Sequence, residues 1–287
     1  MLLYLFHYIS WKVKGGAYMP GRYFEEEQKR LENQLPQSFK DELVLEQKKK
    51  TYKINVCVCY FSSIDQYLET VKYLHINEKS YFLTLKFKKR VESYLAGRYA
   101  AKEAISAFIK DEKLHEIQIT PGIFNQPIVK HSSATSVQVS ISHCDSMGFA
   151  IAFSEETPIG IDIERINIDN KDILAAQMTV GEKRLAKFLS HPDETIYTLL
   201  WTAKESLSKV LKTGLTTPLE IYEINKIDIR KGILYSYYQN FSQYCTASVI
   251  SGQHIYSITY PKETVLDLED FVAKLKMMNR NNENYEI

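Results

Sequence analysis

Short apolar runs rich in β-branched residues recur along most of this chain, and such runs predict strands. The first begins at Ile54 and the last ends at Tyr260. The predicted strands cover residues 54–60, 117–120, 137–141, 149–153, 159–163, 222–229, 233–238, 245–250 and 254–260. Turn-forming pairs such as Pro121-Gly122 and Thr157-Pro158 separate several of them.

Helical spacing of apolar residues divides these strands into two groups. The longest helical pattern runs over about 78–110, with a possible break near Gly97. Further helices are predicted at 170–178, 180–190, 193–212 and 266–277. Each group combines several strands with one long helix. The chain is therefore predicted to have two α/β halves, although no sequence repeat is visible between them.

The start of the chain differs from the rest. It contains a charged stretch rich in Gln and Glu, ending in Lys48-Lys49-Lys50, with few apolar side chains to bury. We predict four segments: a poorly anchored N-terminal extension at 1–51, an α/β subdomain at 52–153, a second at 154–265, and a C-terminal helix with a polar tail at 266–287.

Composition indicates a folded protein with nearly balanced charge. Of 287 residues, 45% are apolar, and the formal net charge is +1. This balance does not require nucleic acid or a membrane surface as partner. No apolar run approaches the ~18 residues of a membrane span. We therefore expect neither a nucleic-acid nor a membrane partner.

The four cysteines resemble core residues more than metal ligands. Cys57 and Cys59 alternate with valines in a predicted strand. Ligand pairs at metal-binding spacing, with histidines close by in the sequence, are missing. Reduced thiols are the better interpretation, and they predict a cytoplasmic location.

The segment Pro158–Arg165 carries two acids on one side of a predicted strand. Residues two apart share a face of a strand, so Asp162 and Glu164 project together. Adjacent carboxylates repel one another, and a cation between them removes that cost. Mg²⁺ takes such oxygen ligands and completes its shell with water and phosphate. The alternative is a strand with a solvated polar face.

A second segment, Trp201–Lys209, places polar groups along a predicted helix. Spacing of four residues puts Trp201, Glu205 and Lys209 on one stripe. Taken alone, a Glu–Lys pair at this spacing is most often a surface ion pair worth a few tenths of a kcal/mol. Upstream, His143 follows the strand segment Ser140-Ile-Ser142. A histidine there is usually structural or exposed, but it can pair with phosphate when protonated.

The order and spacing of these segments resemble the surfactin-type 4′-phosphopantetheinyl transferases. The resemblance covers about 54–260. The matching pieces are Gly122…Pro127, Ser140-Ile-Ser-His143, Pro158-Ile-Gly-Ile-Asp-Ile-Glu-Arg165, Trp201-Thr-Ala-Lys-Glu-Ser-Leu-Ser-Lys209, Gly214-Leu215 and Pro218-Leu219. Two positions depart from the family pattern: Gln126 replaces a lysine, and Cys144 replaces a serine.

The resemblance implies an α/β fold of two similar subdomains about a pseudo-twofold axis, with coenzyme A in the cleft between them. Asp162, Glu164 and Glu205 match the family's Mg²⁺ ligands, and Lys209 matches a lysine that contacts phosphate. The remaining predicted coenzyme A contacts are His143 for the 3′-phosphate, Ser142, Gln126, and the basic pair Arg98 and Lys102, which share one helix face.

The implied reaction moves the 4′-phosphopantetheine arm of coenzyme A to a serine of an apo acyl or peptidyl carrier protein, releasing 3′,5′-ADP. Glu205, Lys209 or a metal-bound water could accept the serine proton, and Glu205, acting directly or through water, is favoured. The resemblance also implies a monomer. A non-catalytic module that binds coenzyme A or the carrier is the alternative. A phosphotransferase on another substrate is a third reading, but the Gly-rich loop of nucleoside triphosphatases is missing from the sequence.

Overall fold

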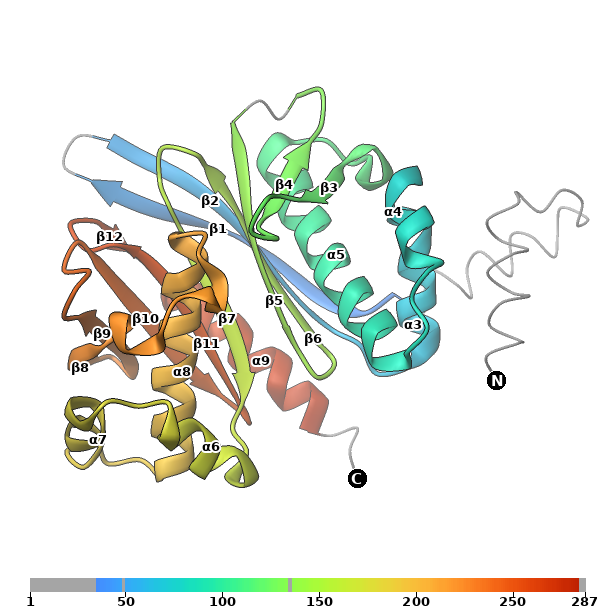
Figure 1. Ribbon diagram of the computed structural model, residues 1–287. Coiled ribbons are helices and arrows are strands. Elements are labelled where there is room, and N and C mark those ends of the chain that lie inside the picture. The colour runs from blue at the N-terminus through green and yellow to red at the C-terminus, as the bar shows by residue number, and fades with distance from the viewer. Residues whose placement is uncertain (1–34, 48–49, 134–135, 284–287) are drawn as a thin grey trace, which may run out of the picture. The chain divides into compact units, whose positions relative to one another are not determined.

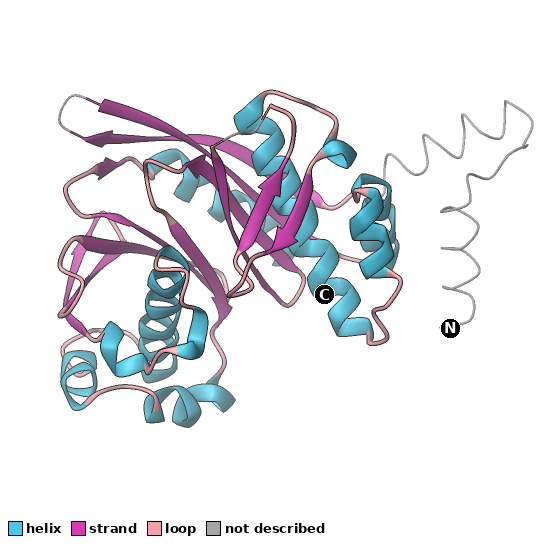
Figure 2. Cartoon of the chain, turned by 45° about the horizontal axis from the view of Figure 1, so that its top comes forward, coloured by secondary structure: helices cyan, strands magenta, loops and turns pink. Residues whose placement is uncertain are grey.

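Two five-stranded antiparallel sheets, each covered by one long helix, make up most of the described chain (Figure 1). This computed structural model describes residues 35–47, 50–133 and 136–283. The first sheet has the strand order β12-β1-β2-β6-β5, and the second has the order β7-β11-β10-β9-β8. Figure 2 shows the strands gathered between the helices of the two halves.

The first half begins with two paired strands, continues with helices and ends with two further pairs of strands. The strands are β1 (Gln37–Gln47), β2 (Lys50–Tyr60), β5 (Val137–Cys144) and β6 (Met147–Ser154), with β3 (Gln118–Pro121) and β4 (Pro127–Lys130) forming a small separate sheet. The helices are α3 (Ile64–Glu69), α4 (Ile76–Phe82) and α5 (Lys88–Ile109), with 3₁₀ turns at Thr70–Tyr73 and Leu114–Glu116. Helix α5 packs on β2, β5 and β6.

The second half follows a similar plan. Its strands are β7 (Gly160–Arg165), β8 (Ile224–Arg230), β9 (Ile233–Tyr238), β10 (Tyr244–Ser251) and β11 (His254–Pro261). Its helices are α6 (Lys171–Ala176), α7 (Val180–Ala186) and α8 (Asp193–Val210), with 3₁₀ turns at Ile168–Asn170, Gly214–Thr216 and Leu219–Tyr222. Strand β12 (Val265–Leu266) then joins β1 in the first sheet, and α9 (Glu269–Glu283) ends the described chain.

The two halves repeat one order of elements, which confirms the predicted pair of α/β units. In each, a strand is followed by two short helices, a long helix and a first pair of strands, β3-β4 or β8-β9. A second pair, β5-β6 or β10-β11, then returns beside the first strand. The pairing β2-β6-β5 in the first sheet corresponds to β7-β11-β10 in the second. The repeat is mainly structural, because the sequences of the halves share little beyond the pairs Lys102-Glu103 and Lys204-Glu205.

A buried ion pair recurs at the same place in both halves. Glu78 closes a capping box at the start of α4, and its Oε2 lies 2.7 Å from Nζ of Lys102 in α5. Glu182 does the same in α7, with Oε2 2.6 Å from Nζ of Lys204 in α8. The second carboxylate oxygen of each accepts from the backbone N–H of a later residue, Ile119 or Ile224. These extra bonds offset the cost of removing both charges from water.

One apolar core is shared by both sheets and by the last helix. Phe149 of β6 packs edge-on against Tyr256 of β11, with ring centroids 5.7 Å apart. It also stacks on Phe271 of α9 at 6.1 Å. Ile161 of β7 belongs to the same buried cluster. Burial of this kind contributes about 25 cal/mol per Å² of apolar surface, so the halves cannot separate without exposing the core.

Three predicted boundaries differ from the structure. Residues 37–47 form β1 and pair along the length of β2, so the predicted loose extension does not reach residue 51; residues 1–34 lie outside the described part. The helical break lies at 83–87, and α5 continues through Gly97, where a side chain would press on Ile141. The C-terminal helix extends to Glu283 and packs on β1 and β10.

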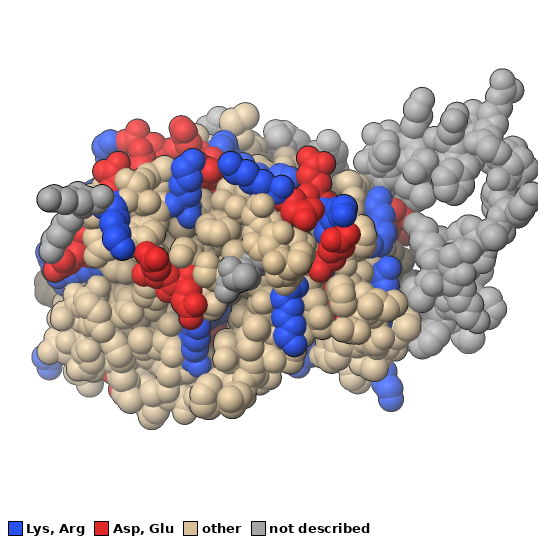
Figure 3. Space-filling model, turned by 90° about the horizontal axis from the view of Figure 1, so that it is seen from above, with Lys and Arg blue, Asp and Glu red and all other residues tan. Residues whose placement is uncertain are grey.

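Charge is spread without a dominant sign on the face shown in Figure 3, where basic and acidic groups alternate along one margin. Among the described residues, no helix combines the length and apolar character that crossing a membrane requires. The mixed signs on this face agree with the formal net charge of +1.

We expect the substitution Lys204→Met to lower the free energy of unfolding by about 3–5 kcal/mol, because it leaves the Glu182 carboxylate buried without its partner. Urea unfolding followed by circular dichroism measures the loss. The matched control is Lys53→Met, which removes an exposed pair with Glu42 and should cost about 0–1 kcal/mol. Equal losses in the two variants would contradict this role of the buried pair.

Candidate active site

The two sheets meet where their edge strands β5 and β7 run side by side. Serine side chains of β5 bridge them: the N–H of Ile161 donates to Ser140 Oγ at 3.1 Å, and the N–H of Ile163 donates to Ser142 Oγ at 3.3 Å. Backbone groups on an edge strand need partners when buried. The Ser-x-Ser spacing therefore holds β7 in a fixed register against β5.

Asp162 is buried at this seam between two donors. Both Ser142 Oγ and Lys209 Nζ lie 2.7 Å from its Oδ1 and donate to it. Its Oδ2 is buried and has no hydrogen-bond partner among the described residues. A buried carboxylate oxygen left in this state is costly, so Asp162 keeps one acceptor for a further group.

Helix α8 approaches β7 closely because Gly160 has no side chain. A Cβ at this position would collide with the backbone oxygen of Ser206. The close approach brings the predicted helical stripe of Trp201, Glu205 and Lys209 beside the acids of β7. The polar residues that the helix spacing and the strand alternation predict therefore lie together in one site.

The acids at this place repel one another. Burial, followed by the charge of Asp162, raises the pKa of Glu164 to about 7. Burial and then Asp162 also raise the pKa of Glu205 to about 8, and Glu164 adds to the effect. Lys209 lowers both values. Three carboxyl groups share one ammonium, so the site favours an added cation or added protons.

Two further side chains hold Glu164. Trp201 donates a hydrogen bond to its carboxylate, and Cys144 Sγ lies 3.8 Å from its Oε2. The carboxylate is therefore fixed from both the helix and the neighbouring sheet. This gives the tryptophan of the helical stripe a polar role, in addition to its packing against the core below α8.

His143 is exposed and lies near Asp162 and Lys209 of this cluster. Partial desolvation and then Lys209 lower its pKa, Asp162 raises it, and Arg90 lowers it further. Arg90, near the start of α5, is therefore a basic neighbour that sequence analysis did not select. Its signal was the basic run at 86–90, which looked like a solvated helix face.

Lys102 and Arg98 lie elsewhere, and this corrects their predicted placement. Lys102 Nζ is fully buried against Glu78 and also donates to the backbone oxygens of Leu114 and Ile117. Arg98 Nε lies 3.4 Å from the same carboxylate. Their shared helix face is real, but it faces the internal ion pair. A buried ammonium with these partners cannot reach a coenzyme A phosphate.

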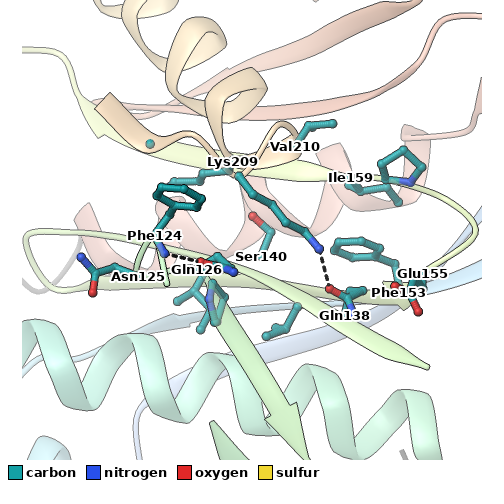
Figure 4. Close-up of a pocket in the computed structure, with 16 residues that line it drawn as sticks. Phe124, Asn125, Gln126, Gln138, Ser140, Phe153, Glu155, Ile159, Lys209 and Val210 are labelled. Carbon is teal, nitrogen blue, oxygen red and sulfur yellow. Dashed lines mark hydrogen bonds between the residues drawn. The ribbon is translucent and has the colours of Figure 1, made fainter. Parts of the chain in front are cut away.

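A cavity of about 240 Å³ lies beside the seam, lined by β5, by the turn at 124–127 and by the end of α8 (Figure 4). Gln126 lines it, but its Oε1 accepts from the N–H of Phe124 at 2.9 Å. On the other side, Lys212 Nζ donates to Gln138 Oε1 at 3.1 Å. The replacement of the family's lysine by Gln126 therefore supports the turn rather than adding charge.

A comparison with models of protein families matches the second half of the chain. Residues 158–260 match the model of the 4'-phosphopantetheinyl transferase superfamily. This stretch contains Asp162, Glu164, Glu205 and Lys209, while His143 precedes it.

Two bacterial proteins illustrate the similarity. A holo-[acyl-carrier-protein] synthase of Geobacillus sp. (strain WCH70) is 42% identical over 81 residues, which are 26% of this chain, and the chain spans 66% of that relative's length. The crystal structure of a holo-(acyl-carrier-protein) synthase from Bacillus anthracis str. Ames in complex with CoA (3',5'-ADP) is 24% identical. The match covers 40% of this chain and 97% of that one, with a TM-score of 0.32.

We expect the ion-free protein to lose stability as pH rises from about 5 to about 8. The folded state holds the protons of Glu164 and Glu205 more tightly than the unfolded state, whose glutamates ionise near 4.5. Glu205→Gln removes one such group and should increase the free energy of unfolding at pH 8 by on the order of 2 kcal/mol.

Urea unfolding in the presence of a chelator, repeated across this pH range, measures the effect. The matched control, Glu46→Gln on the exposed side of β1, should follow the wild-type curve. A wild-type stability that is flat or rises over the range would show that the carboxyl cluster is not strained.

Proposed function

We propose that the chain is a member of the 4'-phosphopantetheinyl transferase superfamily, whose model matches residues 158–260. In this proposal it transfers the 4'-phosphopantetheine arm of coenzyme A to a serine of an apo acyl or peptidyl carrier protein and releases 3',5'-ADP. The observation that carries the proposal is the buried group of Asp162, Glu164 and Glu205 around a single ammonium, that of Lys209. Strand β7 supplies Asp162 and Glu164, and helix α8 supplies Glu205 and Lys209.

A divalent cation fits this group. The donors are all carboxylate oxygens, which suit Mg²⁺. Asp162 Oδ2 is a buried acceptor without a hydrogen-bond partner among the described residues, and the raised pKa values of Glu164 and Glu205 reflect an excess of negative charge. We propose that these three residues hold Mg²⁺, which would neutralise charge on the pyrophosphate of coenzyme A when bound.

Lys209 orients one acid and presents a positive charge at the same time. Its Nζ donates to Asp162 Oδ1 and retains two further N–H donors for a phosphate oxygen. Negative charge on the phosphate oxygens and the leaving group grows during transfer, so a fixed ammonium beside them stabilises the transition state. Ser142 holds Asp162 from the opposite side and keeps this geometry in place.

Glu205 is the proposed acceptor of the carrier serine's proton, directly or through a water molecule. Burial raises its pKa to about 8 in the ion-free site. A bound cation would lower that pKa toward the ordinary value, so Glu205 would be an unprotonated carboxylate able to accept the proton at neutral pH.

The 3'-phosphate of coenzyme A would lie against the basic rim of the cluster. His143 and Arg90 interact there electrostatically, and a protonated imidazole can pair with a phosphate. In the free protein, partial desolvation and Lys209 disfavour the protonated form of His143. We propose that a bound phosphate stabilises the protonated imidazole. Binding of coenzyme A would then weaken as rising pH removes the proton from His143.

The chain contains both sides of the seam, so one molecule suffices for the proposed site, and we propose that it acts as a cytoplasmic monomer. A module that only binds coenzyme A or the carrier would not need three acids around one lysine. The complete set therefore favours an enzyme over that alternative.

We expect Asp162→Asn to reduce transfer at least 10²–10³-fold, because the isosteric amide cannot hold the cation or accept from Lys209 as a charged group. Mass spectrometry of an apo carrier incubated with coenzyme A and Mg²⁺ measures the added phosphopantetheine. Asp228→Asn, which removes an exposed acid of β8, is the matched control. Unchanged transfer by Asp162→Asn, or none by the wild type on a panel of carriers, would reject the proposal.

We expect His143→Ala to raise KM for coenzyme A about tenfold but to leave KM for 3'-dephospho-coenzyme A unchanged, because only the former carries the phosphate that the imidazole would contact. Steady-state rates with both co-substrates at pH 6 and pH 8 measure the difference. A similar rise for both compounds would place His143 in a structural role instead.

A further inference from the structure

Two hairpins bring together a cysteine, an aspartate and a histidine that are far apart in the sequence. Cys144 ends β5, Asp145 begins the turn to β6, and His254 begins β11. The thiol sulfur, a carboxylate oxygen and an imidazole nitrogen of these residues all lie within 4.8 Å of one another. His254 is 110 residues after Cys144 in the sequence, so folding alone makes this contact.

The three side chains differ in exposure but converge. Cys144 is half-buried and its Sγ lies 3.8 Å from Glu164 Oε2. His254 is mostly covered, with 18% of its side chain exposed, and its Nε2 lies 4.0 Å from Asp145 Oδ2. Asp145 is exposed and also meets Arg165 Nη1 at 3.5 Å. Its backbone has a left-handed φ of 49°, which turns the chain sharply after Cys144.

We propose that Cys144, Asp145 and His254 form a binding site for a thiophilic divalent cation of the zinc class. Sulfur, imidazole nitrogen and carboxylate oxygen are the ligands that Zn²⁺ selects, at about 2.0–2.3 Å. Tetrahedral geometry at those bond lengths places ligand atoms roughly 3.5 Å apart, so the present separations need to contract by little more than 1 Å. Glu164 or water would take the fourth position.

Metal binding must remove the thiol proton, because the thiolate is the form that coordinates a metal. One proton therefore leaves to solvent for each ion bound.

The other mixed cluster in the described chain, formed by Asp111, Glu116 and His131, is a weaker candidate. His131 Nδ1 accepts from the N–H of Ser133 at 3.2 Å. The ring proton therefore belongs on Nε2, which lies 3.5 Å from Asp111 Oδ2. A metal bound at Nε2 would have to displace that proton and break the hydrogen bond at Nδ1, so His131 serves as an internal control.

A zinc ion at Cys144 would have a consequence that rests on the proposed function. The ion would lie within reach of the Glu164 carboxylate, which we assign to Mg²⁺, and would draw that ligand away. Zinc would therefore inhibit transfer, and Cys144→Ser would relieve the inhibition, because its hydroxyl can still donate to Glu164 but binds zinc poorly.

The test of the site itself needs neither coenzyme A nor carrier. The full-length protein is titrated with Co²⁺ in excess Mg²⁺, and the absorption band from thiolate-to-cobalt charge transfer is recorded. Zn²⁺ titration by calorimetry in two buffers gives the stoichiometry and the protons released. We expect one ion and one proton per chain, with affinity reduced at least tenfold in Cys144→Ser and His254→Gln.

Control variants make the outcome decisive. Cys245→Ala and His131→Gln should keep the band and the affinity, and Asp162→Asn should keep zinc binding while losing transfer, which separates this proposal from the proposed function. Unfolding midpoints verify that each variant is folded. A thiolate band that survives in Cys144→Ser, disappears in Cys245→Ala, or is absent from the wild type would overturn the proposal, as would zinc affinity unchanged by His254→Gln.

Discussion

The side-chain seam between β5 and β7 is the contact on which the site depends. Two edge strands from different sheets run together, and Ser140 and Ser142 supply the acceptors that the backbone of β7 lacks. The second serine also donates to Asp162. Register across the seam therefore determines where the acids lie relative to His143, which follows Ser142 on β5. A shift by one residue would turn every one of these side chains away.

Charge imbalance is the second constraint. A buried cluster of carboxyl groups with one ammonium is unstable unless protons or a cation enter it. The protein tolerates this arrangement because β7 and α8 are held by independent packing: Ile161 is in the shared core, and Leu207 is in the core below the helix. The stability of these two cores offsets the repulsion among the buried carboxyl groups. Such local repulsion is common where a site is preorganised to bind a charged ligand.

The two halves share one arrangement of elements, but equivalent residues have different roles in them. A buried lysine followed by a glutamate occurs on both long helices, as Lys102-Glu103 and as Lys204-Glu205. Both lysines pair with a helix-capping glutamate, and this part of the repeat is purely structural. The glutamates that follow diverge: Glu103 pairs with Lys40 of β1 at 2.8 Å, whereas Glu205 faces other acids. In the first half Lys40 neutralises Glu103. In the second half Glu205 has acids as neighbours, so its charge is available to a ligand.

The sequence by itself determined what depends on local periodicity. Alternation along a strand placed Asp162 and Glu164 on one side, and helical spacing placed Glu205 and Lys209 on one stripe, because both periods follow from backbone geometry. The two α/β halves could also be predicted from local patterns, because each strand and helix carries its own apolar face.

Only the tertiary structure decided which partner each side chain meets. Arg98 and Lys102 share a helix face as predicted, yet that face turns to Glu78 on another helix. Arg90 stands beside His143, and Cys144 meets His254 across two hairpins. Such contacts arise from the packing of separate elements, which no spacing along the chain encodes, and the physical reason is that burial and charge pairing are properties of three-dimensional neighbourhoods.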